Sequence, residues 1–146
     1  MGQVHIDLNG NSVGATALVT LAIRVLDFKR KEPLLSDTTA RSIAESMDYD
    51  FTSLKIPDMT VVTSLIRMCY LDAKTRDFIL QRPDPKIVIN LGAGLDTRYE
   101  RIGCPEDVAW FDVDLPEVID LRRKFFKETD RRRMVSSSLF DFKWLD

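Results

Sequence analysis

Several features that mark other protein classes are scarce in this sequence. Its 146 residues include two cysteines, Cys69 and Cys104, and a single histidine, His5. The cysteines show no metal-ligand spacing, so we expect reduced thiols in a cytoplasmic protein. One histidine near the N-terminus gives no basis for a histidine-dependent catalytic triad or a histidine metal site, and no metal is expected.

Long apolar runs and a strong charge of one sign are also missing. No apolar segment approaches the ~20 residues that a membrane span needs, and residues 1–11 lack the basic and apolar pattern of a signal peptide. The formal net charge of −2 gives no reason to expect nucleic acid or an anionic membrane as a partner. The chain is long enough for one domain with a hydrophobic core.

The first part of the chain, residues 1–82, is expected to form a helical cover. The segment 17–28 is apolar almost all round, with Arg24 as its polar exception, and predicts a buried helix. A second helix is expected to run to about Met47, with Ser36 or Asp37 as its N-cap. Asp58 is expected to cap a third helix that ends near residue 81. Its apolar positions keep the three-four spacing of a helix: Val62, Leu65, Ile66, Cys69, Tyr70 and Ala73.

The second part, residues 83–146, predicts alternating strands and helices. Strands are expected at 87–91, 109–114 and 134–139, with a helix at 116–128 whose first turn holds Pro116. This order favours a parallel sheet with right-handed crossovers, and hence an α/β fold. Because three strands make a poor parallel sheet, the chain is expected to be the first half of a larger domain, truncated after the third strand.

The most informative segment runs from Ile87 to Asp96, where an apolar strand enters a turn that contains Gly92 and Gly94. Glycines in such a turn let a ligand approach the backbone closely. Asp114 ends the next strand twenty residues after Gly94, a spacing typical of an acid that binds ribose hydroxyls. Asp114 could instead cap the following helix. Its neighbour Asp112 is expected on the opposite face of the strand.

Arg67 and the run of arginines at 131–133 each have two interpretations. Arg67 lies in the middle of the third helix, where it could extend to water or bind a ligand carboxylate with its planar fork. The arginines at 131–133 resemble a phosphate-binding run, but such a run between a helix and a strand is more often a solvated loop. No aromatic residues alternate with them, which argues against nucleic acid.

The segments NLGAGLDTR (90–98) and FDVDLPEV (111–118) resemble the leucine carboxyl methyltransferase family, which includes polyketide-synthesis O-methyltransferases. The resemblance extends upstream to residues 16–24 and 33–37, and downstream to 138–141, Trp144 and Leu145. It implies a class I methyltransferase fold, Rossmann-like, with S-adenosylmethionine as cofactor. The family's fourth strand and substrate-covering part have no counterpart in this chain.

The resemblance also implies roles for individual residues. Gly92, with Gly94, would lie beneath the cofactor, Asp114 would bind the ribose, and Arg67 would hold the methionine carboxylate. Ser138 and Leu139 match the pair beside the adenine ring. The implied reaction is methyl transfer to a carboxylate or hydroxyl of a small-molecule substrate. The sequence identifies neither the methyl acceptor, nor a catalytic base, nor the oligomeric state.

Two alternatives to this function remain open at the level of sequence. The strand, glycine turn and second strand would also suit an NAD(P)-dependent oxidoreductase. Thr97 counts against it, because it stands where the dinucleotide fingerprint has its third glycine. The chain could also be a non-catalytic fragment that binds a nucleotide or a partner chain, since an open sheet edge favours pairing with another chain.

Overall fold

The structure, a computed structural model, describes residues 12–142. His5, Trp144 and Leu145, which entered the sequence interpretation, lie outside this range. The helices and strands follow one another as α1 (Ser12–Asp27), α2 (Thr38–Glu45), the short 3-10 helix η1 (Phe51–Ser53), α3 (Asp58–Gln81), β1 (Lys86–Leu91), α4 (Arg98–Ile102), β2 (Val108–Asp114), α5 (Pro116–Arg122) and β3 (Arg132–Ser136).

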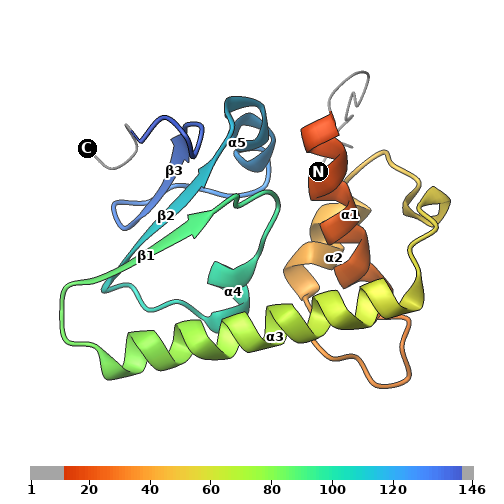
Figure 1. Cartoon of the computed structure of the whole chain (residues 1–146), viewed down its shortest axis with the longest axis horizontal. Coiled ribbons are helices and arrows are strands. Elements are labelled where there is room, and N and C mark those ends of the chain that lie inside the picture. The colour runs from red at the N-terminus through yellow and green to blue at the C-terminus, as the bar shows by residue number, and fades with distance from the viewer. Residues whose placement is uncertain (1–11, 143–146) are drawn as a thin grey trace.

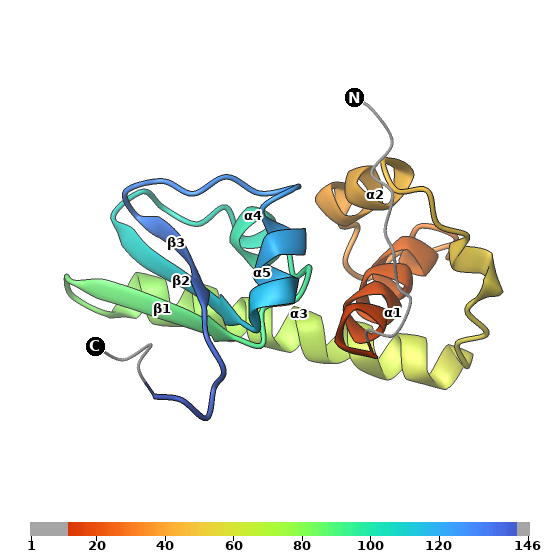
Figure 2. The ribbon, with the colours of Figure 1, turned by 90° about the horizontal axis from the view of Figure 1, so that it is seen from above.

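The elements form two parts joined along one long helix. Figure 1 shows the sheet with α4 and α5 in one part, and α1 and α2 in the other, while α3 runs beneath both. The view from above places α4 and α5 between the sheet and the two N-terminal helices (Figure 2). The predicted order of a helical region followed by an α/β region is therefore observed.

The sheet has three parallel strands in the order β1-β2-β3. Its register pairs Leu91 with Val113 and Asp114 with Ser136, so the carboxyl ends of the strands meet at one edge. This arrangement confirms the predicted α/β class with parallel strands. Ile87 and Ile89, on the face that α5 does not cover, are 51% and 44% exposed.

The main hydrophobic core joins the helical cover to the α/β part. Leu18 and Leu21 of α1 lie in the same buried cluster as Leu95 after the glycine bend and Ile119 of α5. Burying an aliphatic side chain of this kind contributes about 1.5–3 kcal/mol. The cover is thus held by apolar packing directly against the segment that follows β1.

Capping residues explain where two of the helices begin. Asp37 is the N-cap of α2, and its Oδ1 accepts the Ala40 amide at 2.9 Å, which confirms one of the two predicted caps. For α3 the prediction was wrong: Pro57 is the N-cap and makes no side-chain hydrogen bond. Asp58 is the first helical residue, and its carboxylate pairs with Arg30 instead.

Of the apolar positions noted in the sequence of α3, Leu65 is buried, but several others are not. Ile66 and Tyr70 are 56% and 60% exposed, and Ala73 is exposed as well. The buried residues of this helix are Val61, Leu65, Asp72 and Ile79. The helix therefore turns a different line of residues inward, and that line has a charged side chain in its middle.

Two boundaries in the α/β part differ from expectation. Helix α5 ends at Arg122 rather than 128, where the Arg122 guanidinium turns inward and lies 4.2 Å from the centre of the Phe126 ring. Strand β3 begins at Arg132 and ends at Ser136 rather than spanning 134–139. Arg132 is buried between exposed Arg131 and Arg133. The run expected to be a solvated loop therefore lies partly in β3, where successive side chains point to opposite faces of the sheet.

Candidate functional site

The glycine bend connects β1 to the short helix α4. Gly92 and Gly94 both have positive φ, at 65° and 49°, a conformation that glycine adopts without steric cost. The amides of Gly92 and Ala93 donate to the Val113 carbonyl at 2.9 and 3.2 Å. The end of β2 thus anchors the bend, and a Cβ at Gly92 would meet no atom within 4 Å.

Asp114, at the end of β2, lies directly beside this bend. Its Oδ2 accepts the Gly94 amide at 2.7 Å, and its Oδ1 accepts the Leu115 amide at 2.8 Å. An ionised carboxylate has about four acceptor sites, so both oxygens keep further acceptor capacity. The expected orientation of Asp112 was wrong: residues two apart on a strand share a face, and buried Asp112 pairs with Arg122 of α5 at 2.8 Å.

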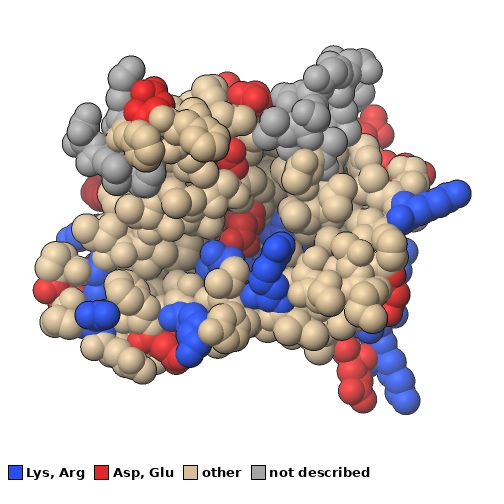
Figure 3. Space-filling view, in the orientation of Figure 1, with Lys and Arg blue, Asp and Glu red and all other residues tan. Residues whose placement is uncertain are grey.

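A pocket of about 420 Å³ opens beside the glycine bend, within the size range of small-molecule sites. In the space-filling view, acidic and basic side chains gather in the hollow between the two parts of the molecule (Figure 3). The pocket is lined by residues of α1, α3, the β1 end, the bend, α4, the β2 end and α5: Thr16, Ala17, Thr20, Arg24, Arg67, Met68, Leu71, Asn90, Leu91, Gly92, Ala93, Gly94, Asp96, Arg98, Asp114 and Val118.

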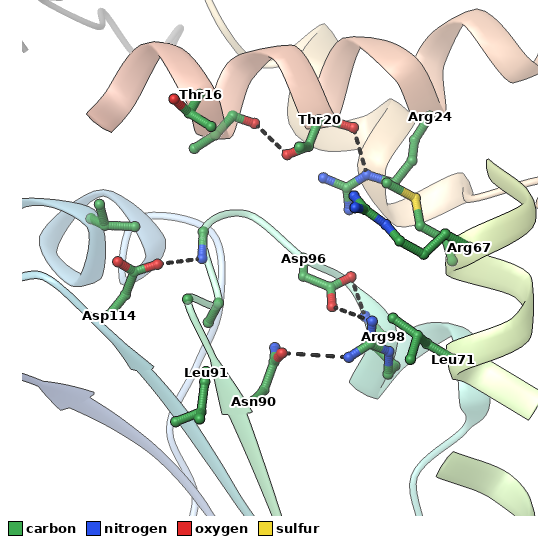
Figure 4. Close-up of a pocket in the computed structure, with 16 residues that line it drawn as sticks. Thr16, Thr20, Arg24, Arg67, Leu71, Asn90, Leu91, Asp96, Arg98 and Asp114 are labelled. Carbon is green, nitrogen blue, oxygen red and sulfur yellow. Dashed lines mark hydrogen bonds and ion pairs between the residues drawn. The ribbon is translucent and has the colours of Figure 1, made fainter. Parts of the chain in front are cut away.

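Arg67 and Asp114 approach the pocket from opposite walls, one from α3 and the other from the β2 end (Figure 4). The Arg67 side chain is exposed, and within residues 12–142 no hydrogen bond or ion pair joins its guanidinium to another side chain or to the backbone of another residue. The structure thus brings together four of the residues singled out from the sequence, namely Arg67, Gly92, Gly94 and Asp114.

Ser138 and Leu139 occupy a different position. They follow β3 and do not belong to the lining of this pocket. The chain nevertheless leaves β3 beside Asp114, because the Ser137 amide donates to the Asp114 carbonyl at 2.9 Å. Both residues are half-buried and lie beyond the same sheet edge as the pocket.

Two buried arginines that the sequence interpretation did not assign to the site hold the bend from behind. Arg122 donates to the carbonyls of Gly94 and Asp96 at 3.0 and 2.8 Å. Arg24 donates to the Leu95 carbonyl at 3.0 Å. The signal available for Arg24 was its position inside an otherwise apolar stretch of α1, because a fully buried charge needs polar partners.

A network of buried charges continues from the bend into α4. Arg101 pairs with Asp96 at 2.9 Å and with Asp72 of α3 at 2.7 Å. Burial alone would lower the pKa of Arg101, but its hydrogen bond to Asp72 and the nearby carboxylates raise that pKa above its ordinary value. Arg101 therefore stays charged and joins the bend to α3.

Asp96 is the carboxylate of this network that also lines the pocket. Burial alone would raise its pKa, but the positive charges of Arg101, Arg98 and Arg24 more than offset this effect and lower the pKa below its ordinary value. Asp96 is therefore an anion at neutral pH. Arg98, which pairs with Asp96 at 3.4 Å, and Arg67 of α3 also line the pocket. The pocket thus presents both signs of charge, which suits a zwitterionic ligand.

Comparison with known proteins identifies the family. The model for the leucine carboxyl methyltransferase family matches residues 17–142. This chain belongs to the leucine carboxyl methyltransferase family. Its parallel sheet, with the glycine bend after β1 and an acid at the end of β2, is the first part of the class I methyltransferase fold that the sequence resemblance implied.

Individual relatives agree with this assignment. The chain is 39% identical over 136 residues to the tetracenomycin polyketide synthesis O-methyltransferase TcmP of Streptomyces glaucescens, covering 92% of this chain and 49% of that protein. It is 32% identical over 142 residues to the S-adenosyl-L-methionine-dependent methyltransferase dpfgK of Gibberella zeae, covering 89% and 48% of the two chains. The chain thus spans about half the length of these relatives.

Three further findings concern membrane spans, metal sites and cysteines in the described part of the chain. Within residues 12–142, no helix has both the length and the apolar character required to cross a membrane. In the same range, no three histidine, cysteine or acidic side chains are grouped so that they could hold a metal ion. Cys69 and Cys104 are free thiols.

Proposed function

We propose that this chain binds S-adenosylmethionine in the pocket beside the glycine bend, as part of an O-methyltransferase that acts on a carboxylate or hydroxyl of a small molecule. One observation carries the proposal. A glycine bend, the strand-end carboxylate Asp114 and an arginine without a partner among residues 12–142 meet at a single pocket. The name of the dpfgK relative supports the same cofactor, and the name of the TcmP relative supports O-methyl transfer.

The residues present fit the cofactor from one end to the other. Arg67 offers a planar fork that matches the methionine carboxylate in bidentate fashion. Gly92 and Gly94 allow close approach of the ligand to the bend. Asp114 keeps acceptor sites for two ribose hydroxyls beyond its bonds to the Gly94 and Leu115 amides. Ser138 would lie beside the adenine, where β3 ends.

The contribution of this half to the reaction is binding and orientation. The bound cofactor supplies a methyl group that is already activated by the sulfonium sulfur. Residues that hold the cofactor rigidly, such as Asp114 and Arg67, raise the rate by aligning that group with the acceptor oxygen. A carboxylate acceptor needs no strong base, whereas a hydroxyl would benefit from one. No described residue is assigned as a catalytic base.

Calorimetric titration of the full-length protein tests the proposal. We expect saturable binding of S-adenosylhomocysteine and none of NAD. Binding of NAD alone would overturn the proposal in favour of an oxidoreductase. The structure argues against that alternative, because the Thr97 hydroxyl accepts a buried hydrogen bond from Arg24 and donates one to Asp37, a role that a glycine could not fill. Binding of neither ligand, with assembly seen by light scattering, would favour a partner-binding protein.

The location of the protein in the cell is proposed from the thiols. Cys69 and Cys104 are unpaired, and reduced cysteines are typical of the cytoplasm. Burial raises the pKa of the Cys104 thiol to about 11, so this thiol stays protonated at neutral pH. Fractionation of cells that express the tagged full-length protein would check the cytoplasmic assignment.

A further inference from the structure

Helix α3 turns an unusual line of residues toward the rest of the molecule. Val61 and Leu65, in its first half, pack with Ile23 of α1, and Ile79 is buried near its end. Between them the buried position belongs to Asp72, which is 3% exposed. A carboxylate is costly to bury unless it is paired, so the partners of Asp72 determine how the middle of α3 is held.

Both partners of Asp72 are arginines of α4, the helix that follows the glycine bend. Arg98 Nε donates to Asp72 Oδ1 at 3.0 Å, and Arg101 donates to both carboxylate oxygens, from Nε at 2.7 Å and from Nη2 at 2.8 Å. Arg101 also pairs with Asp96. The carboxylate of Asp72 is therefore tied through two side chains to the segment that lines the pocket.

Arg67 lies on the same helix, five residues before Asp72. At a rise of about 1.5 Å per residue, the two positions are about 7.5 Å apart along the helix axis. Arg67 lies between the buried positions Leu65 and Asp72, while Ile66 and Tyr70 beside it are exposed. This stretch of α3 is therefore held at Leu65 on one side and at Asp72 on the other. The arginine itself has no partner within residues 12–142. Its place over the pocket thus depends on how α3 is fastened.

We propose that Asp72 is a positioning residue for cofactor binding. It fixes α3 against α4 so that Arg67 faces the glycine bend at the distance that suits the carboxylate of the cofactor's amino-acid end. The inference rests on the proposed function. It adds a residue that does not touch the cofactor, and it predicts that loss of Asp72 weakens only ligands that carry the amino-acid end.

Two ligands separate positioning from general stability. S-adenosylhomocysteine has the amino-acid end, whereas 5′-methylthioadenosine has the same adenine, ribose and thioether without it. In calorimetry on the full-length protein, Asp72→Asn should weaken S-adenosylhomocysteine about tenfold or more, as for a lost charge-assisted contact. It should leave 5′-methylthioadenosine within about twofold. Arg67→Ala should give the same pattern, and the double variant should be no weaker than Arg67→Ala alone.

The matched control is Asp77→Asn, the same substitution at an exposed acid on the same helix, where only a 4.0 Å contact with Lys74 is lost. It should change neither affinity. If Asp72→Asn does not fold, Asp72→Glu carries the test. Its carboxylate keeps the charge, but its extra carbon displaces α3, so S-adenosylhomocysteine should weaken selectively here too.

Three results would overturn the positioning role. One is equal weakening of both ligands by Asp72→Asn, and another is additive losses in the double variant with Arg67→Ala. The third is unchanged affinity for S-adenosylhomocysteine. A wrong proposed function would give another result: the unsubstituted protein would bind neither adenosyl ligand. The positioning role would then be refuted as well.

Discussion

Replacing Asp114 with alanine tests the centre of the proposed cofactor site. In the structure its two oxygens each accept one backbone amide, from Gly94 and Leu115. The remaining acceptor sites are those that would take the ribose hydroxyls. Hydrogen bonds to a charged group contribute about 1.5–3 kcal/mol each when desolvated, and this side chain is only half-buried. We therefore expect a loss of about 1–3 kcal/mol in binding free energy.

This loss corresponds to a dissociation constant about 5- to 150-fold higher, which isothermal titration of S-adenosylhomocysteine into the full-length protein would measure. Asp120→Ala is the matched control, because Asp120 is an acid of the adjacent helix α5 whose side chain is 75% exposed. It should leave the affinity unchanged. Equal affinity of the Asp114→Ala variant and the unsubstituted protein would remove Asp114 from the site.

The same substitution also removes two hydrogen bonds that shape the bend. At about 0.5–1.5 kcal/mol each, their loss should lower the free energy of unfolding by about 1–3 kcal/mol. The variant should still fold, because the amides of Gly92 and Ala93 stay bonded to the Val113 carbonyl. Asp114→Asn keeps an oxygen that can accept the Gly94 amide. It should recover part of the stability but not the affinity, because the charge is gone.

Three further changes probe the bend and the buried charges. Gly92→Ala puts a side chain at a φ of 65° and should lower the free energy of unfolding by about 1–2 kcal/mol in urea titration; an unchanged midpoint would contradict strain at the bend. Arg101→Ala leaves Asp37 and Asp72 without a shared partner and should cost about 3–5 kcal/mol, so a loss below about 1 kcal/mol would refute a tight network. The lowered pKa of Asp96 means that its contribution to stability is complete above its unfolded pKa of about 3.9 and is lost as the pH falls through the lower folded value. Asp96→Asn should therefore reduce the decline of stability below about pH 4, and identical slopes for the two proteins would count against this origin.

The features that could be predicted from the sequence are those set by neighbouring residues. An apolar run followed by Gly92 and Gly94 predicts a strand and a bend, because only glycine readily takes positive φ there. Asp37 precedes a helix and caps it through an amide three residues away. Asp114 could be placed beside the bend, since parallel strands end at one edge of a sheet.

The errors arose where tertiary contacts decide which side of an element is buried. In α3, the apolar positions at helical spacing include Ile66 and Tyr70, yet both are exposed, whereas Asp72 is buried in ion pairs with Arg98 and Arg101 of α4. In the run 131–133, charge predicted a solvated loop, yet Arg132 is buried against Glu100 and the Tyr99 ring. For Asp72 and Arg132, local pattern did not distinguish a buried charge with partners from an exposed one.

The contacts that hold the pocket together join residues far apart in the chain. Arg24 donates to Thr97 across 73 positions, and Arg101 donates to Asp37 across 64. No periodicity relates such pairs, because each becomes close only when the helical cover docks on the α/β part. Arg67 depends on the same docking, since it reaches the pocket from α3 rather than from the strand edge. Local pattern therefore locates the proposed site residues at the strand ends, whereas the position of Arg67 at the pocket follows from the packed fold and was implied in the sequence only by the family resemblance.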